Sequence, residues 1–300
     1  METNYHNPVL LKESVDGLNI NPAGVYVDVT FGGGGHSKEI LSRLNENGRL
    51  YAFDQDVDAQ KNAIDDVRFT LIPQNFRHIK RYLRFYNVKK VDGVLADLGV
   101  SSHQFDEAER GFSTRFDADL DMRMNQTVGL SAFEVVNNYS EEKLSSVLFQ
   151  YSELRNAKAI AKKIVDTRLA APIRTSFELK SILAEFVPKK VEHKVLAQIF
   201  QGIRIEVNQE IEVLKEFLLQ MPELLNKEGR LSVISYHSLE DRLVKRFMKM
   251  GLFEGEPEKD FYGNISVPLK TVGKMVVPNS NEIKENNRAR SAKLRIATLK

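Results

Sequence analysis

Residues 25–37 read VYVDVTFGGGGHS, and this stretch decides the fold of the chain. Its first six residues alternate and are rich in β-branched side chains, which predicts a buried strand. The apolar residues of 37–44 have helical spacing, so a helix is predicted to follow. Between the two lie four glycines, Gly32 to Gly35, whose backbone N–H groups can approach a ligand that a Cβ would block. The stretch therefore predicts a nucleotide-type cofactor site.

Three more predicted strands follow, separated by helical stretches. The strands are expected at residues 49–53, 68–72 and 91–96, and the helical stretches at 37–46, 57–65 and 76–86. Two of the strands end at an acid, Asp54 and Asp97. Strands that alternate with helices are typical of an α/β fold with a parallel, doubly wound sheet.

The alternation stops after the fourth strand. From about residue 105 to 200 no buried strand is evident, and Ser131 and Thr175 each open a capping box that predicts the start of a helix. The remaining expected elements are an amphipathic stretch at 153–169, a long helix at about 193–220, a strand at 230–235, a helix at 238–250 and β-like segments near 265–278 and 292–299. We therefore predict a discontinuous α/β domain, residues 1–104 and 203–300, interrupted by an inserted all-helical domain, residues 105–202.

Composition narrows the class of protein. The 43 basic and 41 acidic side chains give a net charge of +2, so any affinity for nucleic acid must come from local clusters. The N-terminus lacks a cationic and apolar leader, and no apolar run approaches the roughly 18 residues that span a bilayer, which predicts a cytoplasmic protein without a membrane partner. The absence of cysteine excludes disulfides, thiolate metal sites, cysteine-ligated clusters and a cysteine nucleophile.

The residues around the glycines indicate which cofactor binds. No Gly-Lys-Ser/Thr sequence follows them, which argues against a phosphate-binding P-loop. Asp54 lies where a ribose-binding acid of a dinucleotide fold belongs, but His36-Ser37 replaces the third fingerprint glycine. Asp28, just before the loop, favours a ligand with an amino group and little phosphate charge, and S-adenosylmethionine fits this description. Phe76 follows the third strand, where its ring is placed to stack on adenine or to join the core.

Eight stretches of the chain carry a family resemblance. They are HNPVLL at 6–11, DVTFGGGGHS at 28–37, ADLGVSS at 96–102, ERGFS at 109–113, LDMRM at 120–124, FQGIRI at 200–205, SYHSLEDR at 235–242 and NRARSAKLR at 287–295. Through them the chain resembles, over essentially its whole length, the bacterial 16S rRNA (cytosine-N4)-methyltransferases of the RsmH/MraW type.

The resemblance carries expectations about fold, partner and site. It implies a class I S-adenosylmethionine-dependent methyltransferase domain with a helical insertion, and a substrate cytidine in the decoding centre (P-site) of the small ribosomal subunit. It also implies that the cofactor is contacted by Gly34, Gly35, His36, Asp54, Phe76, Asp97 and Gln104.

The missing cysteine bears on the chemistry. Methylation of cytosine C5 usually begins with a cysteine that adds to the ring, so its absence favours direct in-line displacement by the exocyclic N4. N4 is a poor nucleophile, and a carboxylate that accepts its hydrogen helps it react. Asp97 is our hypothesis for that carboxylate, because it ends a strand of an open α/β sheet. His237 and Asp241 are weaker candidates to line the target pocket, since a capping Ser238 with a nearby acid explains the motif equally well. His36 has no second ligand at suitable spacing, so no metal site is predicted.

Three basic groups are candidates for RNA contact. The C-terminal one supplies Arg288, Arg290, Lys293 and Arg295, which lie among small and polar residues. A second, with Arg77, Lys80, Arg81 and Arg84 on one helix face, is more readily explained as a solvated outer surface. The third lies in the predicted insertion and consists of Lys162, Lys163, Arg168, Arg174, Lys189, Lys190 and Lys194. Two other functions stay open beside RNA methylation: a nicotinamide-dependent oxidoreductase and a non-catalytic ribosome-assembly factor. The sequence leaves the oligomeric state undecided between monomer and homodimer.

Overall fold

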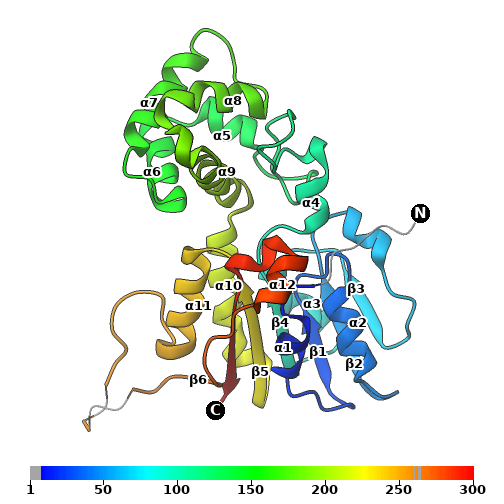
Figure 1. The fold of residues 1–300 in the computed structure, drawn as a ribbon. Coiled ribbons are helices and arrows are strands. Elements are labelled where there is room, and N and C mark those ends of the chain that lie inside the picture. Colours follow the sequence, from blue (N-terminus) through cyan, green and yellow to red (C-terminus); the bar gives the residue numbers. More distant parts are fainter. Residues whose placement is uncertain (1–7, 260, 263–264) are drawn as a thin grey trace. The chain divides into compact units, whose positions relative to one another are not determined.

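The structure is a computed structural model that describes residues 8–259, 261–262 and 265–300. Residues 1–7, on which the expectation of no leader rests and which include the start of the HNPVLL motif, lie outside the described residues. The chain divides into two compact units (Figure 1): Met1–Gly99 with Ile211–Lys300, and Val100–Glu210. The sequence placed the divisions after residues 104 and 202, and the structure places them after residues 99 and 210.

The first unit is built on one seven-stranded sheet with the order β3-β2-β1-β4-β5-β7-β6. Its strands are β1 Val25–Asp28, β2 Arg49–Phe53, β3 Phe69–Ile72, β4 Val91–Asp97, β5 Leu225–Ser235, β6 Leu269–Thr271 and β7 Lys293–Leu299. The neighbours among β1 to β5 are parallel, whereas β7 is antiparallel to both β5 and β6. The predicted mostly parallel α/β sheet is therefore confirmed.

Helices cover both faces of this sheet. Successive side chains of a strand point to opposite faces, and in β1 each of them packs against a different group of helices. Tyr26 of β1 packs in a cluster with Val15 and Ile40. The next residue, Val27, belongs to a different cluster, which contains Leu83, Phe217 and Phe247. The helices of this unit are α1 Leu11–Asp16, α2 Gly35–Ser42, α3 Ile79–Phe85, α10 Glu210–Leu224, α11 Ser238–Met250 and α12 Ser280–Glu285, with 3₁₀ turns η1 Asp58–Asn62, η2 Phe76–His78 and η6 Asn287–Ser291. Cover on both faces explains why Val94, Leu95 and Ala96, three successive residues of the central strand β4, are all buried.

The second unit is helical. Residues 100–210 are described throughout and contain no strand, only an isolated bridge between Asp119 and Thr175. Its helices are α4 Ser102–Asp106, α5 Ala132–Asn138, α6 Glu141–Ser152, α7 Ala157–Arg168, α8 Ser176–Leu183 and α9 Glu192–Asn208, with 3₁₀ turns η3 Ala108–Arg110, η4 Ala184–Phe186 and η5 Lys189–Val191. A separate apolar cluster from Phe112 to Ile203 forms its core. Ser131 and Thr175 close the capping boxes that the sequence predicted.

Several elements differ from the expectation. The helix expected over 193–220 is two helices, because Gln209 adopts a left-handed conformation with φ 51° and ends α9. Residues 57–65 supply only the 3₁₀ turn η1, and β5 begins at Leu225, before an irregularity in its pairing with β4. Across the described residues, no helix combines the length and apolarity needed to cross a membrane.

Candidate cofactor and active site

The predicted site residues of the first unit gather at one edge of the sheet. Strand β1 ends at Asp28, β2 is followed directly by Asp54, and β4 ends at Asp97. Strand β1 lies between β2 and β4, and all three run parallel, so their carboxyl ends meet at the same edge. Open α/β sheets bind their ligands at this edge.

The glycine loop joins β1 to α2 through two left-handed residues, Gly32 with φ 50° and Gly34 with φ 76°. A Cβ on Gly34 would lie 3.0 Å from the Phe31 ring, and one on Gly35 would lie 2.1 Å from Cγ of Pro8. Among the described residues no side chain caps α2, so the amides of its first turn can meet a ligand. The loop thus has the form of a cradle for a small anionic group such as a carboxylate.

Asp28 holds both ends of this loop through hydrogen bonds. Its side chain is completely buried, accepts a 2.7 Å hydrogen bond from Oγ of Ser37 and accepts a second from the amide of Thr30. Burial raises the pKa of Asp28, an effect that the nearby His36 opposes. The carboxyl group therefore fixes the start of α2 against the end of β1.

Asp54 holds the other side of the glycine loop. Its Oδ2 accepts the amide of Gly32 at 2.8 Å, and its Oδ1 accepts the amide of Asp56 at 2.8 Å. Each oxygen retains a lone pair, so the two oxygens can accept hydrogen bonds from the two hydroxyls of a ribose. Burial raises the pKa of Asp54 to about 6.

Phe76 lies in η2, after the carboxyl end of β3. Its ring packs edge-on against Phe217 at 5.3 Å between centroids and is only partly buried. The preceding Asn75 donates to Oε1 of Gln55 at 2.9 Å, which ties the loop after β3 to the residue beside Asp54. Phe76 and Asp54 therefore occupy adjacent loops of the same edge.

Asp97 has two partners from other elements. The hydroxyl of Tyr236 donates to its Oδ1 at 2.7 Å, and Nδ1 of the buried His36 lies 3.8 Å from its Oδ2. Burial raises the pKa of Asp97 to about 6, and His36 and Tyr236 limit the rise. The side chain remains 22% exposed, and with a pKa of about 6 the carboxylate is mostly ionised at pH 7.

Tyr236 is a site residue that the sequence interpretation missed. It follows β5, the strand that pairs with β4, and its amide donates to Oε2 of the buried Glu240 at 3.0 Å. The SYHSLEDR motif was the available indication, but nothing in its spacing points to Asp97, which lies 139 residues away.

The cap of α11 differs from the expectation. The N-cap residue is His237, not Ser238: its ring Nδ1 accepts from the amide of Glu240 at 3.4 Å, and the Glu240 carboxylate accepts from the amide of His237 at 3.4 Å. Asp241 points to the last strand instead, where its carboxylate pairs with Arg295 at 2.7 Å and with Lys293 at 3.3 Å.

The other predicted residues belong to other elements, namely α4, η6 and β7. Gln104 belongs to the second unit, where it closes the capping box of α4 with Ser101. Arg288 and Arg290 lie in η6, the first partly buried and the second exposed. Lys293 and Arg295, expected at RNA phosphates, form the ion pairs with Asp241. The proposed contacts of these residues with cofactor or RNA stay predictions.

The donor set fits S-adenosylmethionine. The first turn of α2 suits an amino-acid carboxylate, and Asp54 suits ribose hydroxyls. The sheet order, with its antiparallel β7, and this site define a class I S-adenosylmethionine-dependent methyltransferase.

Comparison with known proteins identifies the family. Residues 3–300 match the MraW methylase family. The ribosomal RNA small subunit methyltransferase H of Flavobacterium johnsoniae is 67% identical over 98% of this chain and 97% of its own length. The protein of the same name from Bacteroides thetaiotaomicron is 55% identical over 100% of this chain and 99% of its own. A solved rRNA methylase from Streptococcus thermophilus aligns with a TM-score of 0.43 at 11% identity, over 96% of this chain and 94% of that one. The chain belongs to the MraW methylase family.

Proposed function

We propose that this enzyme transfers a methyl group from S-adenosylmethionine to the exocyclic N4 of a decoding-centre cytidine in 16S rRNA. The observation that carries the proposal is the position of Asp97, a partly exposed carboxylate on the same sheet edge as the glycine loop. The relatives named ribosomal RNA small subunit methyltransferase H support the choice of RNA. The absence of cysteine favours nitrogen over ring carbon as the acceptor.

The cofactor would be held by groups already in place. The amides at the start of α2 and His36 would hold its amino-acid end, Asp54 its ribose, and Phe76 would stack on its adenine. When bound, S-adenosylmethionine supplies an activated methyl group on its sulfonium.

Asp97 would act on the amine of the target base. Its ionised carboxylate would accept an N4 hydrogen, raise the electron density on nitrogen and take the proton as the bond from N4 to the methyl group forms, the carbon–sulfur bond of the sulfonium breaks and S-adenosylhomocysteine leaves. Tyr236 holds Oδ1 and leaves Oδ2, on the side of His36, for the base. Holding the two reacting atoms about 3 Å apart supplies much of the remaining rate gain. The cytidine must leave its stack to reach such a site.

In this mechanism His237 and Asp241 take part in no chemical step. His237 caps α11 and Asp241 pairs with β7, which accounts for both without a contact to substrate. We propose that the helical unit recognises the RNA or the assembled subunit, and that Arg288 and Arg290 contribute phosphate contacts.

The decisive experiment supplies labelled S-adenosylmethionine to small subunits that lack the modification and identifies the product nucleoside by mass spectrometry. Label in N4-methylcytidine is expected. Label in 5-methylcytidine, or in no nucleoside, would contradict the proposal. Thermal shifts with S-adenosylhomocysteine and with NAD separate it from an oxidoreductase, and cofactor binding without transfer would indicate a non-catalytic assembly factor.

A further inference from the structure

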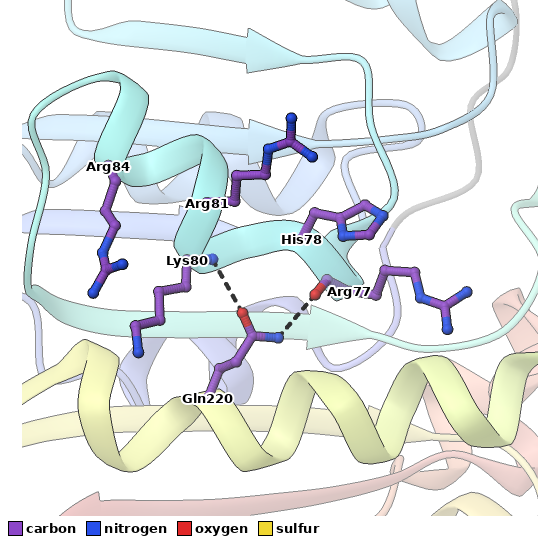
Figure 2. Close-up of a pocket in the computed structure, with 6 residues that line it drawn as sticks. All are labelled: Arg77, His78, Lys80, Arg81, Arg84 and Gln220. Atoms are coloured by element: carbon purple, nitrogen blue, oxygen red, sulfur yellow. Dashed lines mark hydrogen bonds between the residues drawn. The ribbon is translucent and has the colours of Figure 1, made fainter.

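A basic hollow lies between η2 and α3 on one side and α10 on the other (Figure 2). Its volume is about 500 Å³. It is lined by Arg77, His78, Lys80, Arg81, Arg84 and Gln220. Gln220 bridges the two elements, because its amide group donates to the carbonyl of Arg77 at 2.8 Å and accepts from the amide of Lys80 at 3.2 Å.

The cations of the hollow fall into two kinds. Arg77 of η2 is paired with Glu216, and Lys80 of α3 is paired with Glu223, so these two charges are offset and join η2 and α3 to α10. Arg81 and Arg84 are exposed, and neither forms an ion pair with any of the described residues. Glu223 is near enough for its pKa to be lowered by Arg84 as well as by Lys80. The surplus positive charge therefore lies on the outer part of α3.

An exposed aromatic ring adjoins these two arginines. Arg84 lies three residues and Phe85 four residues after Arg81, so Arg81 is a neighbour of both on the helix surface. Its side chain is 78% exposed. The ring of Tyr86 packs edge-on against it at 5.2 Å and itself packs against Tyr51 at 5.6 Å, which supports Phe85 from the side and leaves most of the ring in solvent.

We propose that Arg81, Arg84 and Phe85 form a docking surface for an unpaired segment of the RNA substrate. Guanidinium groups match the geometry of phosphates. An exposed aromatic ring can stack on an unpaired base of any identity. An acidic peptide would use the arginines but would gain little from the ring. The α-helical rise of ~1.5 Å per residue places Phe85 about 9 Å along α3 from Ile79, the residue that follows η2. The inference rests on the proposed function for the identity of the polymer.

Two variants test the surface in the full-length enzyme, Arg81→Gln/Arg84→Gln and Phe85→Ser. The matched control is Lys245→Gln/Lys249→Gln, which removes two exposed charges from α11. The substrate is small subunits lacking the modification, with 16S rRNA transcript as a second probe. We expect the KM for RNA to rise about 10-fold in each α3 variant while kcat stays unchanged. Loss of two phosphate contacts should also reduce the slope of log affinity against log salt by about 1.4, which is 0.7 for each single-strand contact.

Other readouts separate the possible outcomes. The affinity for S-adenosylhomocysteine should be unchanged, because none of the three side chains lies in the glycine loop or the strand ends. Transcript binding is measured separately from methylation, so an inactive wild-type enzyme would count against the proposed function and leave the surface testable. An unchanged KM and salt slope, or the same change in the α11 control, would overturn the docking surface. A photoactivatable residue at position 85 should cross-link to RNA; a cross-link only to a ribosomal protein would also overturn it.

Discussion

Asp97 carries the main prediction at the scale of single residues. Its replacement by Asn keeps the shape and removes the ability to take the N4 proton. We expect turnover at saturating cofactor to fall by about 10²–10⁴-fold, the usual range for a general base. Asp65→Asn, an exposed acid away from the strand ends, is the control. Near-normal methyl transfer by the Asp97 variant would remove Asp97 from the mechanism.

Replacing Tyr236 is expected to change how kcat depends on pH. Its hydroxyl donates to Asp97 and so favours the ionised carboxylate, whose pKa is about 6 with the bond in place. In Tyr236→Phe this pKa rises, so the acid limb of the kcat profile should move to higher pH, with activity at pH 8 within a few-fold of wild type. Tyr82→Phe, at a ring packed against Phe53, should leave the profile unmoved. A loss that is uniform across pH would indicate a purely structural role.

Asp54 predicts a pH dependence of cofactor binding. Burial raises its pKa to about 6, so it is ionised above that pH and protonated below it. Protonation removes an acceptor for the ribose hydroxyls, so calorimetry should show weaker binding of S-adenosylhomocysteine as pH falls from 7 to 5. Asp54→Asn should bind weakly at all these pH values with a smaller pH dependence. Equal affinity of the wild type at pH 5 and pH 7 would contradict the role of Asp54.

At the scale of elements, capping gives a prediction for the helical unit. The Ser131 hydroxyl accepts from the amide of Glu134, and the Glu134 carboxylate accepts from the Ser131 amide at 2.5 Å. Ser131→Ala should lower the free energy of unfolding of this unit by ~1 kcal/mol, as measured by denaturant titration. Ser181→Ala, at an exposed position inside α8, should have almost no effect. Equal stability of the two variants would mean that the cap contributes nothing.

The elements also show how far the sequence predicts the fold. The caps at Ser131 and Thr175 were predictable because the residues that form them are three apart. The break at Gln209 was not, because a left-handed glutamine carries no local pattern that marks it. His237 was missed as a cap because Ser238 beside it is the commoner capping residue.

In the site, too, features set by nearby residues could be predicted, whereas contacts between residues far apart in the sequence could not. Asp54 and Asp97 were predictable because each stands at the end of a recognisable strand. Their partners were not, since the amide that meets Asp54 is 22 residues away and the hydroxyl that meets Asp97 is 139 residues away. Such pairs depend on strand order, which the alternation of apolar residues does not specify.

At the scale of the whole molecule, each unit has its own core. Among the described residues, the apolar cluster of residues 100–210 contains side chains of the helical unit, and the clusters around the sheet contain side chains of the sheet unit. Separate cores allow the two units to open independently. A ligand that binds one unit should therefore stabilise that unit and leave the other almost unchanged.

Hydrogen exchange with S-adenosylhomocysteine tests this independence. At 100 times its Kd the ligand stabilises the state that binds it by ~2.7 kcal/mol, which corresponds to exchange slowed about 100-fold. We expect this slowing in β1, β2, β4 and α2, where the glycine loop, Asp54 and Asp97 lie, and none in α5 to α9. Slowing confined to residues 102–106 within the second unit would support the predicted contact of Gln104 with the cofactor, because that helix carries Gln104. Equal slowing throughout both units would show instead that they unfold as one, since a ligand held by one unit protects the other only when the two open together.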